Sequence, residues 1–190
     1  MIHARIERQR PVNVPSYIVP GLMSGSVRTL VRPVASIGPV RPGYGLWVRE
    51  GIRISPSQHR KDTLYFTYAG EGQRSAVPWM PLVAKPYGGY RAPEHMPIQA
   101  SRLTLLVKQV ETMRLEQVVE ADAITSGLSI SEGGYAVMGH PFLVPFETHS
   151  DALGFLLNQQ EPLTEDNPEV SVVRFRAVAR NIERLMRNAR

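Results

Sequence analysis

Hydrophobic residues recur with two different periods along this chain. Runs rich in β-branched and aromatic residues predict strands over residues 46–54, 62–69, 102–110 and 170–178. Apolar residues at helical spacing predict helices over residues 114–126, 151–159 and 180–190. Gly127, directly after the first of these helices, suits a helix C-cap. This mixture of elements predicts an α+β fold.

The segments between these elements predict loops. Residues 55–60, 129–146 and 161–169 are of this kind, and residues 74–96 form the longest one. The long segment interleaves aromatic residues with cations: Trp79, Lys85, Tyr87, Tyr90 and Arg91. Such a set can stack on bases and neutralise phosphates of a flipped base or a single strand. The alternative is that these side chains only hold the loop against the rest of the domain.

Composition limits the class of protein. A chain of 190 residues suits one domain with a real core, and the absence of an apolar run of 18 residues predicts no membrane span. The N-terminal residues lack an apolar signal core, so secretion is not expected. The absence of cysteine excludes disulfides and thiolate metal sites. The five histidines lack ligand-like spacing, so we predict neither a metal site nor a cofactor.

Charge is distributed unevenly along the chain. The net charge is +5, but residues 1–61 carry ten Lys and Arg against two acids, whereas the remainder carries twelve against fifteen. Such asymmetry suggests a basic face that binds phosphate, with ordinary solubilisation as the alternative. Residues 1–14 contain Arg5, Arg8 and Arg10 and predict a basic arm, either frayed or an edge strand.

Four motifs together resemble a known family. They are LWVRE (46–50), HMP-x-x-ASR-x-T-L (95–105), DA-x-x-x-GL (122–128) and NP-x-V-x-VV-x-F (167–175). In this order they resemble the ASCH-domain, PUA-like proteins of tailed phages and prophages, over about residues 17–178. The resemblance implies a small, mostly antiparallel PUA-like β-barrel with a few helices packed around it, in the cytoplasm of a bacterial host. It implies a domain over residues 15–179, followed by a basic helical tail over residues 180–190.

The catalytic positions of related ASCH enzymes are degenerate in this chain. Enzymes of this kind hydrolyse acylated cytidine with a Lys, a Thr and a downstream Glu. At the corresponding positions this sequence has Val27, Leu30 and Ser126, and a shift of one residue brings Arg28 to the Lys position. Arginine cannot act as the base because its guanidinium stays protonated. The resemblance therefore implies a cleft that binds its ligand without reacting.

The predicted binding residues combine phosphate donors with aromatic groups. They are Arg28, Thr29, Arg32, Trp47, Arg49, Lys85, Tyr87, Tyr90, Arg91, Ser101 and Arg102. A rearranged catalytic set would use Glu50 with Thr29 or His95. The simpler interpretation makes Glu50 an ion-pair partner that orients arginines, and His95 a structural residue of the HMP turn.

Three functions remain open at this point. The favoured one is non-catalytic binding of nucleic acid, either RNA or a modified nucleoside, in a basic cleft. The second is an active nucleoside amidohydrolase or ribonuclease that uses the rearranged residues. The third is an accessory protein that binds another phage protein or the virion. None of the three needs a cofactor or a membrane.

Overall fold

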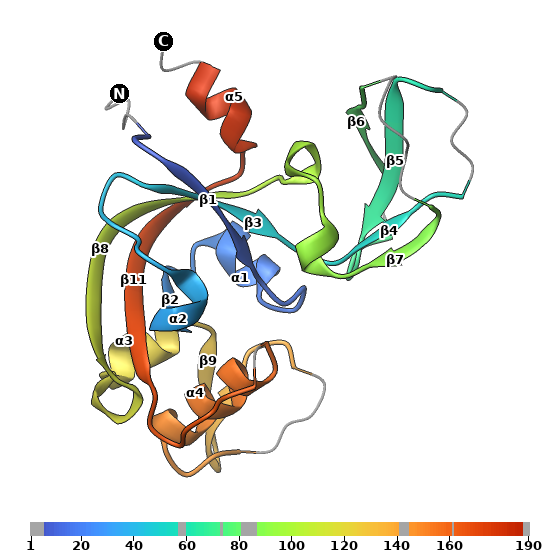
Figure 1. The fold of residues 1–190 in the computed structure, drawn as a ribbon. Coiled ribbons are helices and arrows are strands. Elements are labelled where there is room, and N and C mark those ends of the chain that lie inside the picture. Colours follow the sequence, from blue (N-terminus) through green and yellow to red (C-terminus); the bar gives the residue numbers. More distant parts are fainter. Residues whose placement is uncertain are drawn as a thin grey trace.

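The computed structural model describes residues 6–56, 60–72, 74–80, 87–140, 145–160 and 162–187. The larger of its sheets has the strand order β1-β3-β8-β11-β2. Its strands are β1 (Gln9–Asn13), β3 (Gly45–Arg49), β8 (Thr104–Arg114), β11 (Glu169–Val178) and β2 (Thr29–Pro33). Neighbouring strands are antiparallel except β1 and β3, which are parallel. The long pair of β8 and β11 forms the centre of this sheet (Figure 1).

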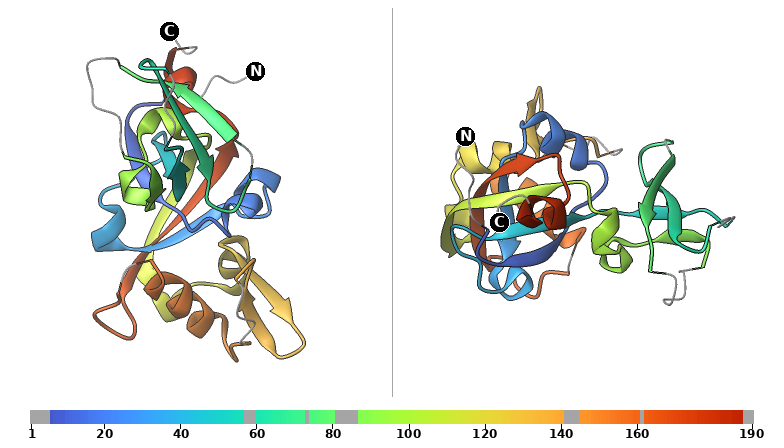
Figure 2. Two further views of the ribbon diagram at one scale, coloured as in Figure 1. Left: turned by 90° about the vertical axis from the view of Figure 1, so that its right-hand side faces the viewer. Right: turned by 90° about the horizontal axis from the view of Figure 1, so that it is seen from above.

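A second, smaller sheet is inserted between β3 and β8. Its order is β6-β5-β4-β7, and all its pairs are antiparallel. The strands are β4 (Ile52–Ile54), β5 (Thr63–Tyr68), β6 (Arg74–Pro78) and β7 (Gly89–Arg91). Figure 2 shows this small sheet standing away from the larger one. A separate hairpin joins β9 (Leu128–Ser131) and β10 (Gly134–Val137).

Short helices cover the larger sheet and make the connections. The α-helices are α1 (Val19–Ser24), α2 (Val34–Ile37), α3 (Glu120–Thr125), α4 (His149–Asn158) and α5 (Ile182–Arg187). The 3₁₀ turns are η1 (Pro93–His95), η2 (Ile98–Ala100) and η3 (Leu115–Gln117). Within the described residues, no helix is both long and apolar enough to cross a membrane.

The two sheets have separate hydrophobic cores. The larger core surrounds β11, where Val170, Val172 and Val173 are all fully buried. Consecutive buried residues mean that both faces of β11 are covered. The smaller core lies on one face of the small sheet, and its buried members are Ile52, Ile54, Leu64, Phe66, Tyr68, Met96 and Ala100. Each sheet therefore buries its own apolar face.

The structure confirms the α+β fold, with mostly antiparallel pairing, but not a closed barrel. Among the described strands, β1 and β2 are the unpaired edges of the larger sheet. These edges approach each other, because Arg32 on β2 donates from Nη2 to the carbonyl of Asn13 on β1 at 3.1 Å. The described backbone nevertheless forms no ladder between them. Residues 9–13 are an edge strand, one of the two outcomes expected for the N-terminal arm.

Several predicted elements agree with the structure. The final strand and α4 lie within a residue or two of their predicted bounds, and α5 lies inside the predicted tail helix. Thr148 caps α4, since its Oγ1 accepts from the Asp151 amide at 3.1 Å.

Four predicted segments were wrong. The helix predicted over residues 114–126 shrinks to η3 and α3, because β8 pairs with β11 as far as Arg114 and a helix cannot begin inside that ladder. The strand predicted over residues 46–54 breaks into β3 and β4, which belong to different sheets. The predicted loops over residues 74–96 and 129–146 contain β6, β7 and the β9–β10 hairpin.

Candidate nucleic-acid interface

A cavity of about 540 Å³ lies between the small sheet, the connection into β8 and the C-terminal segment. Its lining residues are Tyr68, Val77, Gln99, Ala100, Ser101, Arg102, Ala179, Arg180, Asn181, Arg184 and Arg187. Four of these residues are arginines and none is an acid. We call this cavity the arginine pocket. Its composition suits an anionic ligand.

The C-terminal wall of the arginine pocket is fixed by hydrogen bonds to the connection. Asn181 Nδ2 donates to the carbonyls of Ile98 at 2.7 Å and Ser101 at 2.8 Å. Its Oδ1 accepts from the Glu183 amide at 2.9 Å, which satisfies a free donor at the start of α5. Ile182 is fully buried and anchors the opposite side of this segment. The C-terminal wall is therefore held by the hydrogen bonds of Asn181 and by the buried side chain of Ile182.

The side chains of three arginines on this wall have no hydrogen-bond or ion-pair partner within the described part of the chain. Arg180, Arg184 and Arg187 are exposed, and their guanidinium groups make neither a hydrogen bond nor an ion pair there. Arg184 and Arg187 are one turn apart on α5, so they lie on neighbouring positions of one helix face. Like charges gathered without ion-pair partners favour the binding of an external anion.

The fourth arginine, Arg102, is held in place by two carboxylates and an aromatic ring. Its Nε and Nη2 bind Glu50 Oε1 and Oε2 at 2.8 and 2.9 Å, and its Nη1 binds Glu71 Oε2 at 2.8 Å. Its guanidinium carbon lies 3.8 Å from the centre of the Tyr68 ring. These contacts join the connection into β8 to the connection between β3 and β4 and to the small sheet. Arg102 therefore has a structural role as well as a place in the pocket wall.

Burial changes the acidity of two groups around Arg102. The Glu50 side chain is only 2% exposed, and this burial raises its pKa, whereas the hydrogen bonds and charge of Arg102 oppose the change. Burial also raises the pKa of Tyr68 to about 12, so its hydroxyl keeps its proton and donates to the Ala100 carbonyl at 2.9 Å. Glu71 is more exposed, and its hydrogen bond to Arg102 lowers its pKa.

The phosphate donors predicted on β2 do not form an open cluster. Thr29 is buried, and its Oγ1 lies 2.9 Å from Thr125 Oγ1. Arg32 is also buried and donates to the carbonyls of Val31 and Asn13. Arg28 is exposed just before the strand. Of the three predicted donors, only the Arg28 side chain is open to solvent.

The predicted residues of β3 and the HMP motif have mainly internal partners. The Arg49 guanidinium lies 5.7 Å from the centre of the Trp47 ring and donates to the Glu94 carbonyl at 3.2 Å. Ser101 is buried and donates from Oγ to the Val48 carbonyl at 2.9 Å. Of these predicted residues, Ser101 and Arg102 line the arginine pocket.

Two of the three aromatic residues predicted in the long loop are open to solvent. Tyr87 is 88% exposed and Tyr90, on β7, is 53% exposed. Arg91 Nη2 donates to the Tyr87 carbonyl at 3.0 Å. Trp79 packs instead against the core of the small sheet. Lys85 lies outside the described residues.

The rearranged catalytic set is not connected in the structure. Both oxygens of Glu50 are occupied by Arg102, and Thr29 is bound to Thr125. His95 is exposed in η1. In the described residues no hydrogen bond joins Glu50 to Thr29 or to His95. This arrangement matches the ion-pair interpretation of Glu50.

The residues that sequence reasoning missed come from the tail and from a turn. Arg180, Arg184 and Arg187 recur at spacings of four and three residues, a signal visible in the sequence beside the apolar Ile182. Glu71 gave no such signal, because its pairing with Arg102 spans 31 residues and depends on the inserted sheet.

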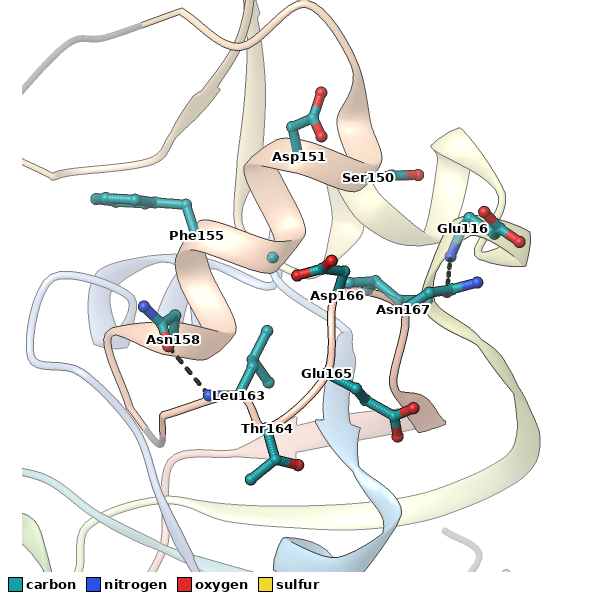
Figure 3. Close-up of a pocket in the computed structure, with 12 residues that line it drawn as sticks. Glu116, Ser150, Asp151, Phe155, Asn158, Leu163, Thr164, Glu165, Asp166 and Asn167 are labelled. Carbon is teal, nitrogen blue, oxygen red and sulfur yellow. Dashed lines mark hydrogen bonds between the residues drawn. The ribbon is translucent and has the colours of Figure 1, made fainter.

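A second and larger cavity, of about 760 Å³, has the opposite character (Figure 3). It lies between α4 and residues 162–167, and its lining includes Glu116, Asp151, Glu165 and Asp166. Carboxylates repel phosphate, so this cavity does not suit a nucleic acid. The described residues contain no group of three His, Cys, Asp or Glu side chains arranged to hold a metal ion.

Comparisons with known proteins give no family assignment. No protein-family model, no curated protein and no solved structure matches this chain. The assignment to the ASCH and PUA-like proteins of phages therefore stays a prediction that rests on its four motifs.

Proposed function

We propose that this protein binds nucleic acid without catalysis, and that phosphates of the ligand occupy the arginine pocket. The observation that carries the proposal is the set of Arg180, Arg184 and Arg187, which line one wall and make no ion pair within the described residues. Guanidinium groups bind phosphate oxygens through paired N–H donors. A site of this kind holds the ligand by its backbone, whatever the base sequence.

The remaining features of the proposal come from the family resemblance. The four motifs resemble ASCH-domain proteins of tailed phages and prophages, and this favours RNA or a modified nucleoside as the ligand. The resemblance also favours a PUA-like barrel, and the hydrogen bond from Arg32 to Asn13 between the two sheet edges supports such a curvature. The degenerate Lys, Thr and Glu positions favour binding over hydrolysis.

A substitution of the three tail arginines tests the proposal. We expect Arg180→Ala/Arg184→Ala/Arg187→Ala to weaken binding of a short labelled RNA by at least about a hundredfold at low salt, because each charged hydrogen bond contributes about 1.5–3 kcal/mol. Fluorescence anisotropy with single-stranded and double-stranded RNA and DNA measures the affinity and identifies the preferred strand type.

A matched control removes the same charge elsewhere. Arg41→Ala/Lys108→Ala/Arg176→Ala also removes three exposed cations, and none of them lines the arginine pocket. We expect this control to lose less than about tenfold in affinity, through the weaker long-range field alone. Equal losses in both variants would contradict a localised site, and no binding by the wild-type protein at low salt would reject nucleic acid as the ligand.

A further inference from the structure

The small sheet has an outer face that its core does not use. Side chains alternate along β5, so that Leu64, Phe66 and Tyr68 point into the small core. Thr63, Tyr65 and Thr67 therefore point to the other side. We call that side the outer face of the small sheet. It also includes Arg53, Arg74, Ala76, Pro78 and Tyr90.

Strand register places four of these residues in one row across the sheet. Tyr90 is opposite Arg53, Arg53 is opposite Thr67, and Thr67 is opposite Arg74. Residues that are directly opposite in antiparallel strands share a face, with side chains about 5 Å apart. The row therefore crosses all four strands from β7 to β6, and it alternates aromatic, cationic and hydroxyl groups.

A second tyrosine lies beside this row. Tyr65 is two residues from Thr67 on β5, and the Arg74 guanidinium carbon lies 4.5 Å from the centre of its ring. Tyr90 is 53% exposed, and Arg53 and Arg74 are exposed as well. The outward positions of the described strand residues include two tyrosines and two arginines but no carboxylate.

We infer that the outer face of the small sheet is a stacking platform for the bases of single-stranded nucleic acid. Tyrosine rings on a sheet surface stack with unpaired bases, and the neighbouring arginines neutralise the phosphates between them. A duplex cannot use such a face, because its bases are already stacked on one another. The positive charge of the face complements a polyanion. The two tyrosine rings favour flat bases over the carboxylates of an acidic protein, because only the bases stack on them.

The platform adjoins the proposed phosphate site through one strand. On β6, Val77 lines the arginine pocket, whereas Arg74 and Ala76 alternate with it and face outward. A single-stranded nucleic acid that crosses the edge of β6 therefore contacts both the arginine pocket and the outer face of the small sheet. The choice of nucleic acid as the ligand rests on the proposed function. The preference for single-stranded nucleic acid and the second binding surface are inferred from the small sheet itself.

The test replaces both rings by a smaller apolar side chain and leaves the net charge unchanged. We expect Tyr65→Leu/Tyr90→Leu to weaken binding of a single-stranded 12-nucleotide RNA by about ten- to a hundredfold, with an unchanged dependence on salt. The control Tyr65→Phe/Tyr90→Phe keeps both rings and should bind within about twofold of the wild type. A 12-nucleotide abasic strand, which carries phosphates but no bases, should bind the wild type and the leucine variant equally. Tyr90→Leu alone, at an exposed position, should show part of the loss even if the double variant is unstable.

The outcomes separate the platform from the pocket. Loss of base-dependent affinity in the leucine variants, with the phenylalanine control intact, supports the platform. Wild-type affinity in the leucine variants, or an equal loss for the abasic strand, overturns it. If the arginine variant loses binding and the leucine variants do not, only the platform fails. If the leucine variants lose binding and the arginine variant does not, only the pocket fails.

Discussion

Replacing Arg102 by methionine should lower the free energy of unfolding by about 3–5 kcal/mol. The substitution leaves the carboxylate of Glu50 buried, with 2% of its side chain exposed, and without its bidentate partner. A buried charge without a partner is far more costly than the loss of the pair as a whole. Denaturant unfolding monitored by circular dichroism measures the change.

Two further variants test the reason for this loss. Glu71→Gln removes the other carboxylate from the same guanidinium, but Glu71 is 39% exposed, so we expect a cost of only about 0–1 kcal/mol. Glu50→Leu/Arg102→Met removes both buried charges and should recover most of the stability lost in Arg102→Met. A double variant as unstable as the single one would show that packing, and not the unpaired carboxylate, causes the loss.

Replacing Phe66 by alanine should unfold the small sheet while the larger sheet stays folded. Phe66 is 1% exposed in a core to which the described part of the chain contributes seven buried residues, and Phe→Ala in a core costs about 3–5 kcal/mol. Such a loss exceeds the free energy of unfolding expected for a small sheet with so few core residues. Hydrogen exchange should show fast amides in β4 and β5, with β8 and β11 still protected.

The matched control is the same substitution in the larger core. Phe175 is 4% exposed on β11, so Phe175→Ala should lower the protection of β8 and β11 amides by a similar free energy. If Phe66→Ala instead lowers protection equally in both sheets, the two cores form one cooperative unit. That result would contradict the separation of the two cores.

Sequence reasoning succeeded where local pattern decides the structure. The strand predicted over residues 62–69 is β5 (Thr63–Tyr68), because the alternation of Leu64 and Phe66 with Tyr65 and Thr67 is a local signal that needs no knowledge of the pairing partner. Sequence reasoning failed where the presence of a strand depends on the strands with which it pairs. Strands β6 and β7 are short and largely exposed, and they are held by ladders to β5 and β4 that no local signal predicts.

The candidate site was predictable only in part, for the same reason. Arg102 stands in a recognisable motif and was predicted, together with its neighbour Ser101. The basic tail helix was also predicted, but not its place in the fold. That place depends on the hydrogen bonds from Asn181 to the carbonyls of Ile98 and Ser101, about 80 residues earlier in the chain. Thr29 and Arg32 were predicted as phosphate donors but are buried, because polar residue type alone does not predict exposure.

The salt dependence of RNA affinity tests the central claim most directly. The measurement is the slope of log Kd against log salt concentration for a short single-stranded RNA, with the wild-type protein and with Arg180→Ala/Arg184→Ala/Arg187→Ala. Each phosphate neutralised on a single strand contributes about 0.7 to the slope, so the loss of three contacts should make the slope shallower by about 2. Equal slopes for the two proteins would show that these arginines do not contact phosphate, and would contradict the proposed site.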